Sequence, residues 1–351
     1  MLNHSCQTNN FTSRASDMTS LLANTQLSPR ESRVIGALLG VHAGDSLGST
    51  VEFESHERVA RTYPNGLRDI VGGGPFRWPV GHATDDTDMT RGVLLAYHDR
   101  YHRGIQQDIA RLAGDYFVDW LQGDWPERER GSNPEDIGNA TQIGLDIYKT
   151  TRDPDNAGSG QGAAGNGSLM RCIPTGLFQS DPEKMIEESQ RISKITHDDK
   201  RCTISCAAYN TIASKLIDQV TVQEAIEAGL AVAGKLEGKQ GVVYKAIALG
   251  EELNIAKMAQ EGPSPRIRCS GYVLGSLSLA IAAVLDQRSL EDVVVDVVRI
   301  GHDTDTNAAI AGGLLGARDG AEAVPPRWRS VLQFGDEFEI KALELMRSIK
   351  D

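Results

Sequence analysis

The sequence has no apolar run of the about 18 residues that a membrane-spanning helix needs, although 40% of its 351 residues are hydrophobic. It also lacks an excess of basic residues. Its 36 Lys and Arg stand against 48 Asp and Glu, a formal net charge of −12, which argues against nucleic acid and anionic membranes as partners. The first 30 residues show no secretion signal. We therefore expect a soluble protein.

Cysteine is also scarce. The five cysteines are odd in number and scattered, at Cys6, Cys172, Cys202, Cys206 and Cys269. Such a set does not form a disulfide framework, so we expect a protein of the reducing cytoplasm. Cys202 and Cys206 lie four residues apart, on one face of an expected helix, and are most simply small buried hydrophobic residues.

Alternating runs of β-branched residues, which mark half-buried strands, are almost absent. The three valines at 293–295 are the best strand candidate, but their surroundings also fit a buried helix. No repeat of about 20 to 50 residues is present, which disfavours a solenoid. Apolar residues instead recur at helical spacing, so the sequence predicts an all-α protein. Helices are expected over 34–48, 84–97, 105–121, 139–147, 270–286, 289–300, 306–317 and 335–350, with several more between 182 and 263.

Two regions are predicted as loops, 52–84 and 151–168, because they are rich in turn residues such as glycine. Residues 1–27 form a third distinct region, in which 14 of the 27 are Ser, Thr, Asn or Gln. This composition predicts a flexible N-terminal arm, which either has no function or orders on a partner.

The globular part is expected to be one domain over residues 28–351. It opens with a capped helix start, in which Ser28 is the N-cap, Pro29 the first helical residue and Glu31 the returning acid of a capping box. The length of 351 residues allows two domains but fits one large domain equally well.

Two acidic clusters carry the strongest chemical signal. One is Thr84-Asp85-Asp86-Thr87-Asp88, and the other, more than 200 residues later, is His302-Asp303-Thr304-Asp305-Thr306. Each lies where a loop enters a helix and offers the oxygen ligands that Mg²⁺ and Mn²⁺ prefer. Asp and Thr at a helix start can also be ordinary caps. Five Asp gathered in two places exceed what capping needs, and if the clusters meet, their repulsion calls for cations.

Single residues add weaker signals. Glu52 and Asp136 each lie at a helix edge beside small residues, and are either solvated or candidates for acid–base work. His197 is either a surface or capping residue or a ligand contact, and Tyr272 either belongs to the core or stacks on a base.

Glycine-rich segments could bind phosphate. The loop 165–168 and the run 72–74 either present backbone N–H groups to phosphates or form plain turns. The run 160–165 reads GQGAAG and matches a dinucleotide fingerprint, but it follows a polar stretch rather than a strand, so we discount it.

Taken together, these segments resemble the ADP-ribosylglycohydrolase family over roughly residues 30 to 350. The matching motifs are GALLGVHAGDSLGSTVEFE from Gly36, GGPFRWPVGHATDDTDM from Gly73, DIGNAT from Asp136, GNGSLMR from Gly165, TH from Thr196, SGY from Ser270 and GHDTDTNAAIAGGLLGA from Gly301. The resemblance implies an all-α fold, a single compact orthogonal helical bundle with a two-metal site in a cleft.

The resemblance also implies roles for individual residues. Two Mg²⁺ or Mn²⁺ ions would be held by Thr84, Asp85, Asp86, Asp303, Asp305 and Thr306, whereas Asp88 has no implied role. Glu52 and Asp136 match acids of the family, Asp136 that of the bacterial arginine-specific branch. Substrate contacts would be made by Asn166, Gly167, Ser168 and His197 on the diphosphate or a ribose, and by Tyr272 on adenine.

The implied reaction is hydrolysis that removes ADP-ribose from a modified protein side chain, first of all from arginine, which reverses an ADP-ribosyltransferase. Carboxylates stabilise the oxocarbenium-like transition state of such a reaction, and Glu52 or Asp136 would assist proton transfer. Serine and O-acetyl-ADP-ribose linkages are alternatives. Some bacterial members are immunity proteins, so in a further alternative residues 1–27 bind and block an ADP-ribosylating toxin. A phosphatase-like use of the metals would leave Tyr272 without a role.

Overall fold

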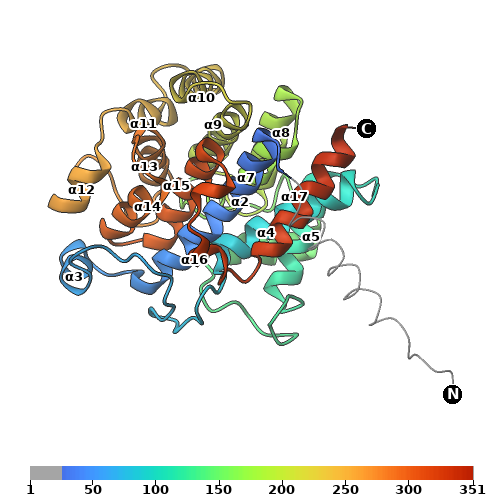
Figure 1. Ribbon diagram of the computed structural model, residues 1–351. Helices are drawn as coiled ribbons and strands as arrows, with labels where there is room; N and C mark the ends of the chain where they lie inside the picture. The colour runs from blue at the N-terminus through green and yellow to red at the C-terminus, as the bar shows by residue number, and fades with distance from the viewer. Residues whose placement is uncertain (1–25, 351) are drawn as a thin grey trace.

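The computed structural model describes residues 26–350, and every helix or strand assigned in this part of the chain is a helix (Figure 1). The all-α prediction is therefore confirmed. The β-type pairings of the described residues are two isolated bridges, Gly73 with Trp78 and Gly165 with Tyr272. Of the predicted arm, residues 1–25 lie outside the described residues.

The elements follow one another along the chain as α2 Pro29–Gly48, η1 Ser49–Val51, α3 His56–Thr62, α4 Asp85–Tyr101, α5 Ile109–Leu121, α6 Asn139–Thr151, α7 Ile173–Phe178, α8 Pro182–Lys194, α9 Lys200–Ile217, α10 Val222–Glu237, α11 Val242–Gly250, α12 Ile255–Glu261, α13 Val273–Leu285, α14 Leu290–Arg299, α15 Thr304–Asp319, η2 Ala321–Ala323, α16 Pro326–Arg329 and α17 Gly335–Lys350. The three valines at 293–295 are helical, within α14. The segment 151–168 is a loop apart from the last residue of α6, as predicted.

The predicted start of the domain forms as a complete capping box. The Ser28 side chain accepts a hydrogen bond from the Glu31 backbone N–H, and the Glu31 carboxylate accepts one from the Ser28 N–H at 2.8 Å. These contacts satisfy N–H groups that the first helical turn leaves without partners. They fix where α2 begins.

The structure corrects one predicted helix start and adds a short helix within a predicted loop. The helix expected from residue 105 begins at Ile109, because the Asp108 side chain caps it by accepting the backbone N–H of Arg111. Within the predicted loop 52–84, the short helix α3 forms behind Ser55, which caps it in the same way.

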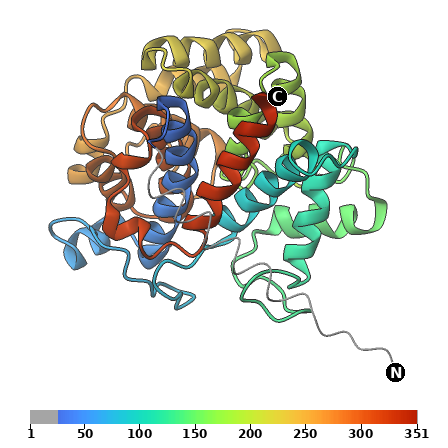
Figure 2. The same cartoon turned by 45° about the vertical axis from the view of Figure 1, so that its right-hand side comes forward.

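Helices α2 and α15 pack side by side through the centre of the molecule (Figures 1 and 2). A Cβ atom added to Gly44 of α2 would lie 2.2 Å from the backbone oxygen of Ala308, and one added to Gly48 would lie 2.4 Å from that of Thr304. The two backbones are therefore in direct contact, which side chains larger than hydrogen would prevent. This contact places the end of α2 beside the start of α15.

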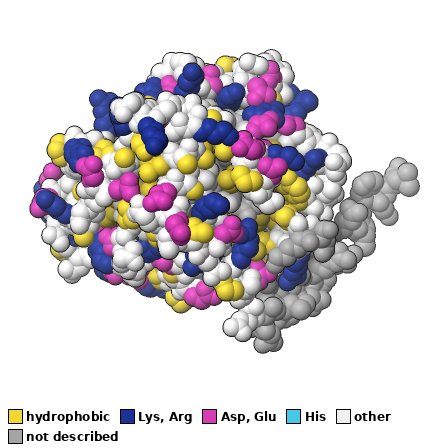
Figure 3. Space-filling model, turned by 90° about the horizontal axis from the view of Figure 1, so that it is seen from above, with side chains coloured by type: hydrophobic (Ala, Val, Ile, Leu, Met, Phe, Trp, Pro, Cys, Tyr) yellow, Lys and Arg dark blue, Asp and Glu magenta, His cyan; other side chains and the backbone are white. Residues whose placement is uncertain are grey.

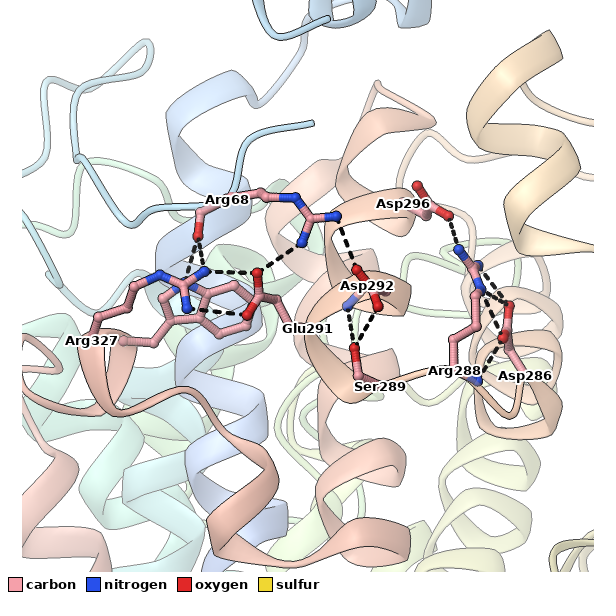
Figure 4. Close-up of polar contacts among 9 residues, drawn as sticks. Arg68, Asp286, Arg288, Ser289, Glu291, Asp292, Asp296 and Arg327 are labelled. Atoms are coloured by element: carbon pink, nitrogen blue, oxygen red, sulfur yellow. Dashed lines mark hydrogen bonds and ion pairs between the residues drawn. The ribbon is translucent and has the colours of Figure 1, made fainter. Parts of the chain in front are cut away.

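Ion pairs fasten the loop between α3 and α4 to the C-terminal half of the chain (Figure 4). The Arg68 guanidinium pairs with Glu291 at 2.8 Å and with Asp292 at 2.9 Å, both on α14. Arg327 on α16 pairs with the same Glu291 at 2.7 Å and donates to the Arg68 backbone oxygen at 3.0 Å. Exposed ion pairs are individually weak, but this network links three segments. It anchors the loop that leads into α4.

The surface seen in Figure 3 carries acidic and basic side chains interspersed with apolar ones, so neither sign of charge dominates that face. Among the helices of residues 26–350, none is both long and apolar enough to cross a bilayer.

Candidate functional site

A cleft of about 500 Å³ lies where the end of α2, the start of α4 and the start of α15 meet. Its wall includes most of the residues that the sequence singled out: Glu52, Asp85, Asp136, Asn166, Gly167, His197, Asp303, Asp305 and Thr306. Thr84 and Asp86 lie directly behind this wall and are buried. The fold thus gathers both acidic clusters in one place.

The first cluster is held by a residue to which the sequence assigned no role, Asp45. This carboxylate, buried on α2, accepts hydrogen bonds from the Thr84 N–H at 3.1 Å, the Thr84 hydroxyl at 2.8 Å and the Thr87 N–H at 3.2 Å. It also accepts a short hydrogen bond from the Thr87 hydroxyl. Burial raises the pKa of Asp45 to about 7, although these hydrogen bonds oppose the rise. The sequence feature that could have pointed to Asp45 is a charged residue within the largely apolar run 34–48 of α2.

The second cluster is joined to Glu52 through the backbone. The Phe53 N–H donates to the His302 carbonyl at 2.7 Å, and the His302 N–H donates to the Glu54 carbonyl at 2.7 Å. Both central residues have left-handed backbones, with φ of 64° for Phe53 and 70° for His302. Residues with a Cβ adopt this conformation at a cost, which the paired hydrogen bonds offset. The pairing sets Glu52 beside Asp303.

The two clusters meet at the level of individual oxygen atoms. Carboxylate oxygens of Glu52, Asp303 and Asp305 lie within 4.8 Å of one another. The Thr306 hydroxyl oxygen lies 3.3 Å from Oδ2 of Asp86, on the first cluster. Thr84 approaches the same Asp86 oxygen at 3.3 Å. Oxygen ligands from both ends of the chain therefore converge.

The charges of this group are poorly compensated within the described protein. Burial, followed by repulsion among the carboxylates, raises the pKa of Asp85, Asp86 and Asp305 well above the usual range. The same causes raise the pKa of Glu52 to about 8. Oδ1 of Asp86 and Oε2 of Glu52 are buried without a hydrogen-bond partner. Unpaired anionic oxygens are costly to bury, and this donor set suits hard divalent cations.

Asp136 lies between two cavities. Its carboxylate accepts the Asp85 backbone N–H at 2.9 Å, and burial raises its pKa to about 6. Besides the cleft, it lines a second cavity of about 260 Å³. That cavity is rich in carboxylates and indole rings, contributed among others by Asp88, Glu127, Glu129, Glu135, Trp78 and Trp120.

The glycine loop forms another part of the cleft wall. Asn166 donates from Nδ2 to Oδ2 of Asp303 at 2.6 Å, which ties the loop to the acidic group. His197 lies against the loop and is 2% exposed, so the alternative of a surface histidine is wrong. Ser168 is buried beneath the loop, where its hydroxyl accepts a hydrogen bond from Ser193 at 2.9 Å, and it does not line the cleft.

Tyr272 is also absent from the cleft wall. Its backbone bridges to Gly165, but its side chain belongs to a neighbouring cavity. The guanidinium carbon of Arg201, which does not line that cavity, lies 5.8 Å from the centre of the tyrosine ring. The structure therefore pairs the Tyr272 backbone with the glycine loop and sets its ring against the Arg201 guanidinium.

Comparisons with known proteins agree with this architecture. A family model described as ADP-ribosylglycohydrolase matches residues 26–350. ADP-ribosylarginine hydrolase Tri1 of Pseudomonas putida (strain GB-1) is 30% identical over 314 residues, which cover 89% of this chain and 77% of that protein. ADP-ribosyl-[dinitrogen reductase] glycohydrolase of Rhodospirillum rubrum is 27% identical, covering 88% of this chain and 93% of that protein. A solved structure, an ADP-ribosylglycohydrolase-related protein complex, superposes with a TM-score of 0.71 at 27% identity and covers 92% of this chain and 99% of that chain.

Proposed function

The chain belongs to the ADP-ribosylglycohydrolase family, and from this membership we propose that it removes ADP-ribose from arginine side chains of modified proteins with the help of two divalent cations. The observation that carries the proposal is the convergence of both acidic clusters and Glu52 in one cleft. Asp136 joins this cleft to a second acidic cavity.

The Thr84 and Thr306 hydroxyls each lie 3.3 Å from Oδ2 of Asp86, whose Oδ1 is buried without a hydrogen-bond partner. The cations would be held by six residues at this place: Thr84, Asp85, Asp86, Asp303, Asp305 and Thr306. Mg²⁺ and Mn²⁺ fit this set, because all its ligands are carboxylate or hydroxyl oxygens. When bound, the ions supply Lewis acidity toward the ribose hydroxyls and a lowered pKa for water.

Glu52 and Asp136 divide the acid–base work. In the cation-free protein, burial and repulsion from Asp303 raise the pKa of Glu52 to about 8, above that of Asp136, so Glu52 is the better suited of the two to hold a proton and give it to the departing nitrogen. Water adds to the anomeric carbon as the C–N bond breaks, and its proton returns to Glu52. Asp136, whose pKa burial raises only to about 6, is ionised and stabilises the oxocarbenium-like state.

Arginine is favoured over other linkages because the second cavity suits a guanidinium. Its carboxylates and indole faces are the groups that attract a planar cation. The cavity already holds one guanidinium, that of Arg128, which donates to the Trp120 carbonyl at 2.7 Å with its carbon 5.9 Å from the Trp120 ring centre. Two relatives named ADP-ribosylarginine hydrolase, from different bacteria, agree with this assignment.

Release of ADP-ribose from an arginine-ADP-ribosylated protein tests the proposal. We expect release in Mg²⁺ or Mn²⁺, none in chelator, and a loss of at least about a hundredfold in Asp303→Ala, because a ligand shared by the acidic group is removed. Asp319→Ala, at the far end of the same helix, is the matched control and should keep full activity.

Parallel assays on serine-linked ADP-ribose and on O-acetyl-ADP-ribose test the linkage. Faster turnover of either would contradict the assignment to arginine while leaving the hydrolase intact. Full activity in chelator would contradict the metal centre.

A further inference from the structure

Arg171 is a fully buried cation with no acidic partner among the described residues. Its Nη1 donates to the Gly167 carbonyl at 3.2 Å, and its Nη2 donates to the Thr196 hydroxyl oxygen at 2.6 Å. The guanidinium carbon lies 4.4 Å from the centre of the Phe117 ring. Burying a charge without an ionic partner costs free energy, so the contacts that hold Arg171 in place point to a role other than packing.

The bond from Arg171 determines where the Thr196 hydroxyl hydrogen lies. A guanidinium only donates, so the Thr196 oxygen must accept from Arg171. The other hydrogen-bond partner of this hydroxyl within residues 26–350 is Nδ1 of His197, at 2.8 Å. If Nδ1 carried the ring hydrogen, the buried Thr196 hydroxyl would accept twice and its own hydrogen would have no acceptor among the described residues. Donation of that hydrogen to Nδ1 pairs every group, so the unprotonated ring nitrogen is Nδ1. In a neutral imidazole the ring hydrogen then lies on Nε2.

The imidazole is neutral at physiological pH. Burial, and after it the positive charge of Arg171, lower the pKa of His197 to about 3. Nε2 makes no hydrogen bond to the described protein and lies toward the glycine loop, where a Cβ added to Gly165 would be 3.3 Å away. A Cβ added to Gly167 would lie 3.0 Å from Cε1 of His197, the ring carbon next to Nε2. Side chains at these two positions would therefore press on the ring, whereas the glycines leave this side of it open. His197 itself lines the cleft.

We propose that Arg171 and Thr196 are positioning residues that hold His197 in its Nε2–H tautomer, so that the ring donates a hydrogen bond to an oxygen of the nucleotide bound in the cleft. This inference rests on the proposed function for the identity of that nucleotide. The Arg171 bond to the Gly167 carbonyl fixes the loop on the same side of the ring, so one guanidinium sets both the loop and the donor.

The tautomer can be observed directly. Long-range ¹H–¹⁵N correlation on protein with ¹⁵N-labelled histidine rings distinguishes the two neutral tautomers and the cation, and His197→Gln assigns the signal. We expect the Nε2–H pattern at neutral pH in wild-type protein. An Nδ1–H pattern or a charged ring would overturn the proposal, whatever the enzyme hydrolyses.

Binding of ADP-ribose in Mg²⁺, measured by calorimetry, tests the consequence. Thr196→Val removes the hydroxyl at constant shape, and we expect affinity to fall about tenfold, KM to rise more than kcat falls, and the ring signal to lose its Nε2–H pattern. Thr196→Ser restores the hydroxyl and should return both readouts. Thr211→Val is the matched control, because this buried threonine bonds the Ala207 carbonyl within α9.

Wild-type affinity in Thr196→Val, or equal loss in Thr196→Ser, would overturn the positioning role. If instead the wild-type protein binds ADP-ribose with the expected tautomer yet hydrolyses no arginine linkage, the proposed function fails and the positioning role stands.

Discussion

Two carboxylates that line neighbouring cavities, the half-buried Glu52 and the buried Asp88, are stabilised in different ways. Both oxygens of Asp88 accept indole N–H groups, from Trp120 at 2.9 Å and from Trp125 at 2.8 Å. Oε2 of Glu52 is buried and has no partner among the described residues. Asp88 is therefore satisfied by the protein itself, whereas Glu52 leaves an oxygen for a proton, a cation or a substrate.

The pKa values of both carboxylates are raised to about 8, chiefly by burial, and this makes stability depend on pH in a defined direction. In cation-free protein the pKa of Glu52 is raised from 4.5 to about 8, chiefly by burial, so the folded state binds a proton that the unfolded chain releases. Stability should therefore be highest below about pH 4.5 with respect to this group and fall as pH rises toward about 8. The partial exposure of Glu52 limits its share to about 2 kcal/mol.

Urea unfolding in chelator at about pH 5 and about pH 8 measures the effect. Glu52→Gln should reduce the dependence without abolishing it, because the raised pKa values of Asp45 and Asp88 remain, whereas Glu227→Gln, an exposed change on α10, should leave it unchanged. Added Mg²⁺ should restore stability at the higher pH, since cations favour the ionised carboxylates. Stability of the cation-free protein that rises over this range would contradict the assignment.

At the scale of elements, the packing of α2 on α15 decides whether the site exists. The ends of these helices carry Asp45 and the second acidic cluster, and their backbones touch at Gly44 and Gly48. A displacement of one helix along the other would separate Glu52 from Asp303. The glycines therefore control the geometry of the acidic group from outside the cleft wall.

Gly44→Ala should lower the free energy of unfolding by at least about 3 kcal/mol, because its Cβ meets the Ala308 carbonyl and no side chain can move away. Gly234→Ala on α10 is the matched control. Its Cβ would find neighbours no closer than 3.6 Å, so the better helix propensity of alanine should stabilise by up to about 1 kcal/mol. Equal effects of the two changes in urea unfolding would rule out the backbone contact as the cause.

The helices and the acidic clusters could be predicted because their signals are local. The Ser28 cap, the apolar spacing and the run of small residues in α2 each occupy adjacent positions. What could not be predicted depends on distant partners. The role of Asp45 depends on its hydrogen bonds to Thr84 and Thr87, about 40 residues away. The role of Arg171 likewise depends on its hydrogen bond to Thr196. Tyr272 shows the same limit, since its neighbours decide which cavity it faces.

At the scale of the whole molecule, the cleft draws on a wide stretch of the described chain. Its residues lie between Glu52 and Thr306. Deletion of residues 1–27 should therefore leave hydrolysis unchanged. If the arm is a partner-binding segment, the same deletion should abolish capture of a cognate ADP-ribosyltransferase in a pull-down with purified components. Unchanged capture would remove the arm from consideration, and lost hydrolysis would place it in the enzyme.

The contact between α2 and α15 also sets the order in which the parts of the site come together during synthesis. A ribosome delivers the chain from its N-terminus, so Asp45, Glu52 and the first acidic cluster emerge long before Thr306 is made. Until α15 is made, Gly44 and Gly48 of α2 lack the helix on which they pack, and the first acidic cluster lacks the second. A nascent or prematurely terminated chain that ends before α15 therefore lacks the second acidic cluster and cannot assemble the site.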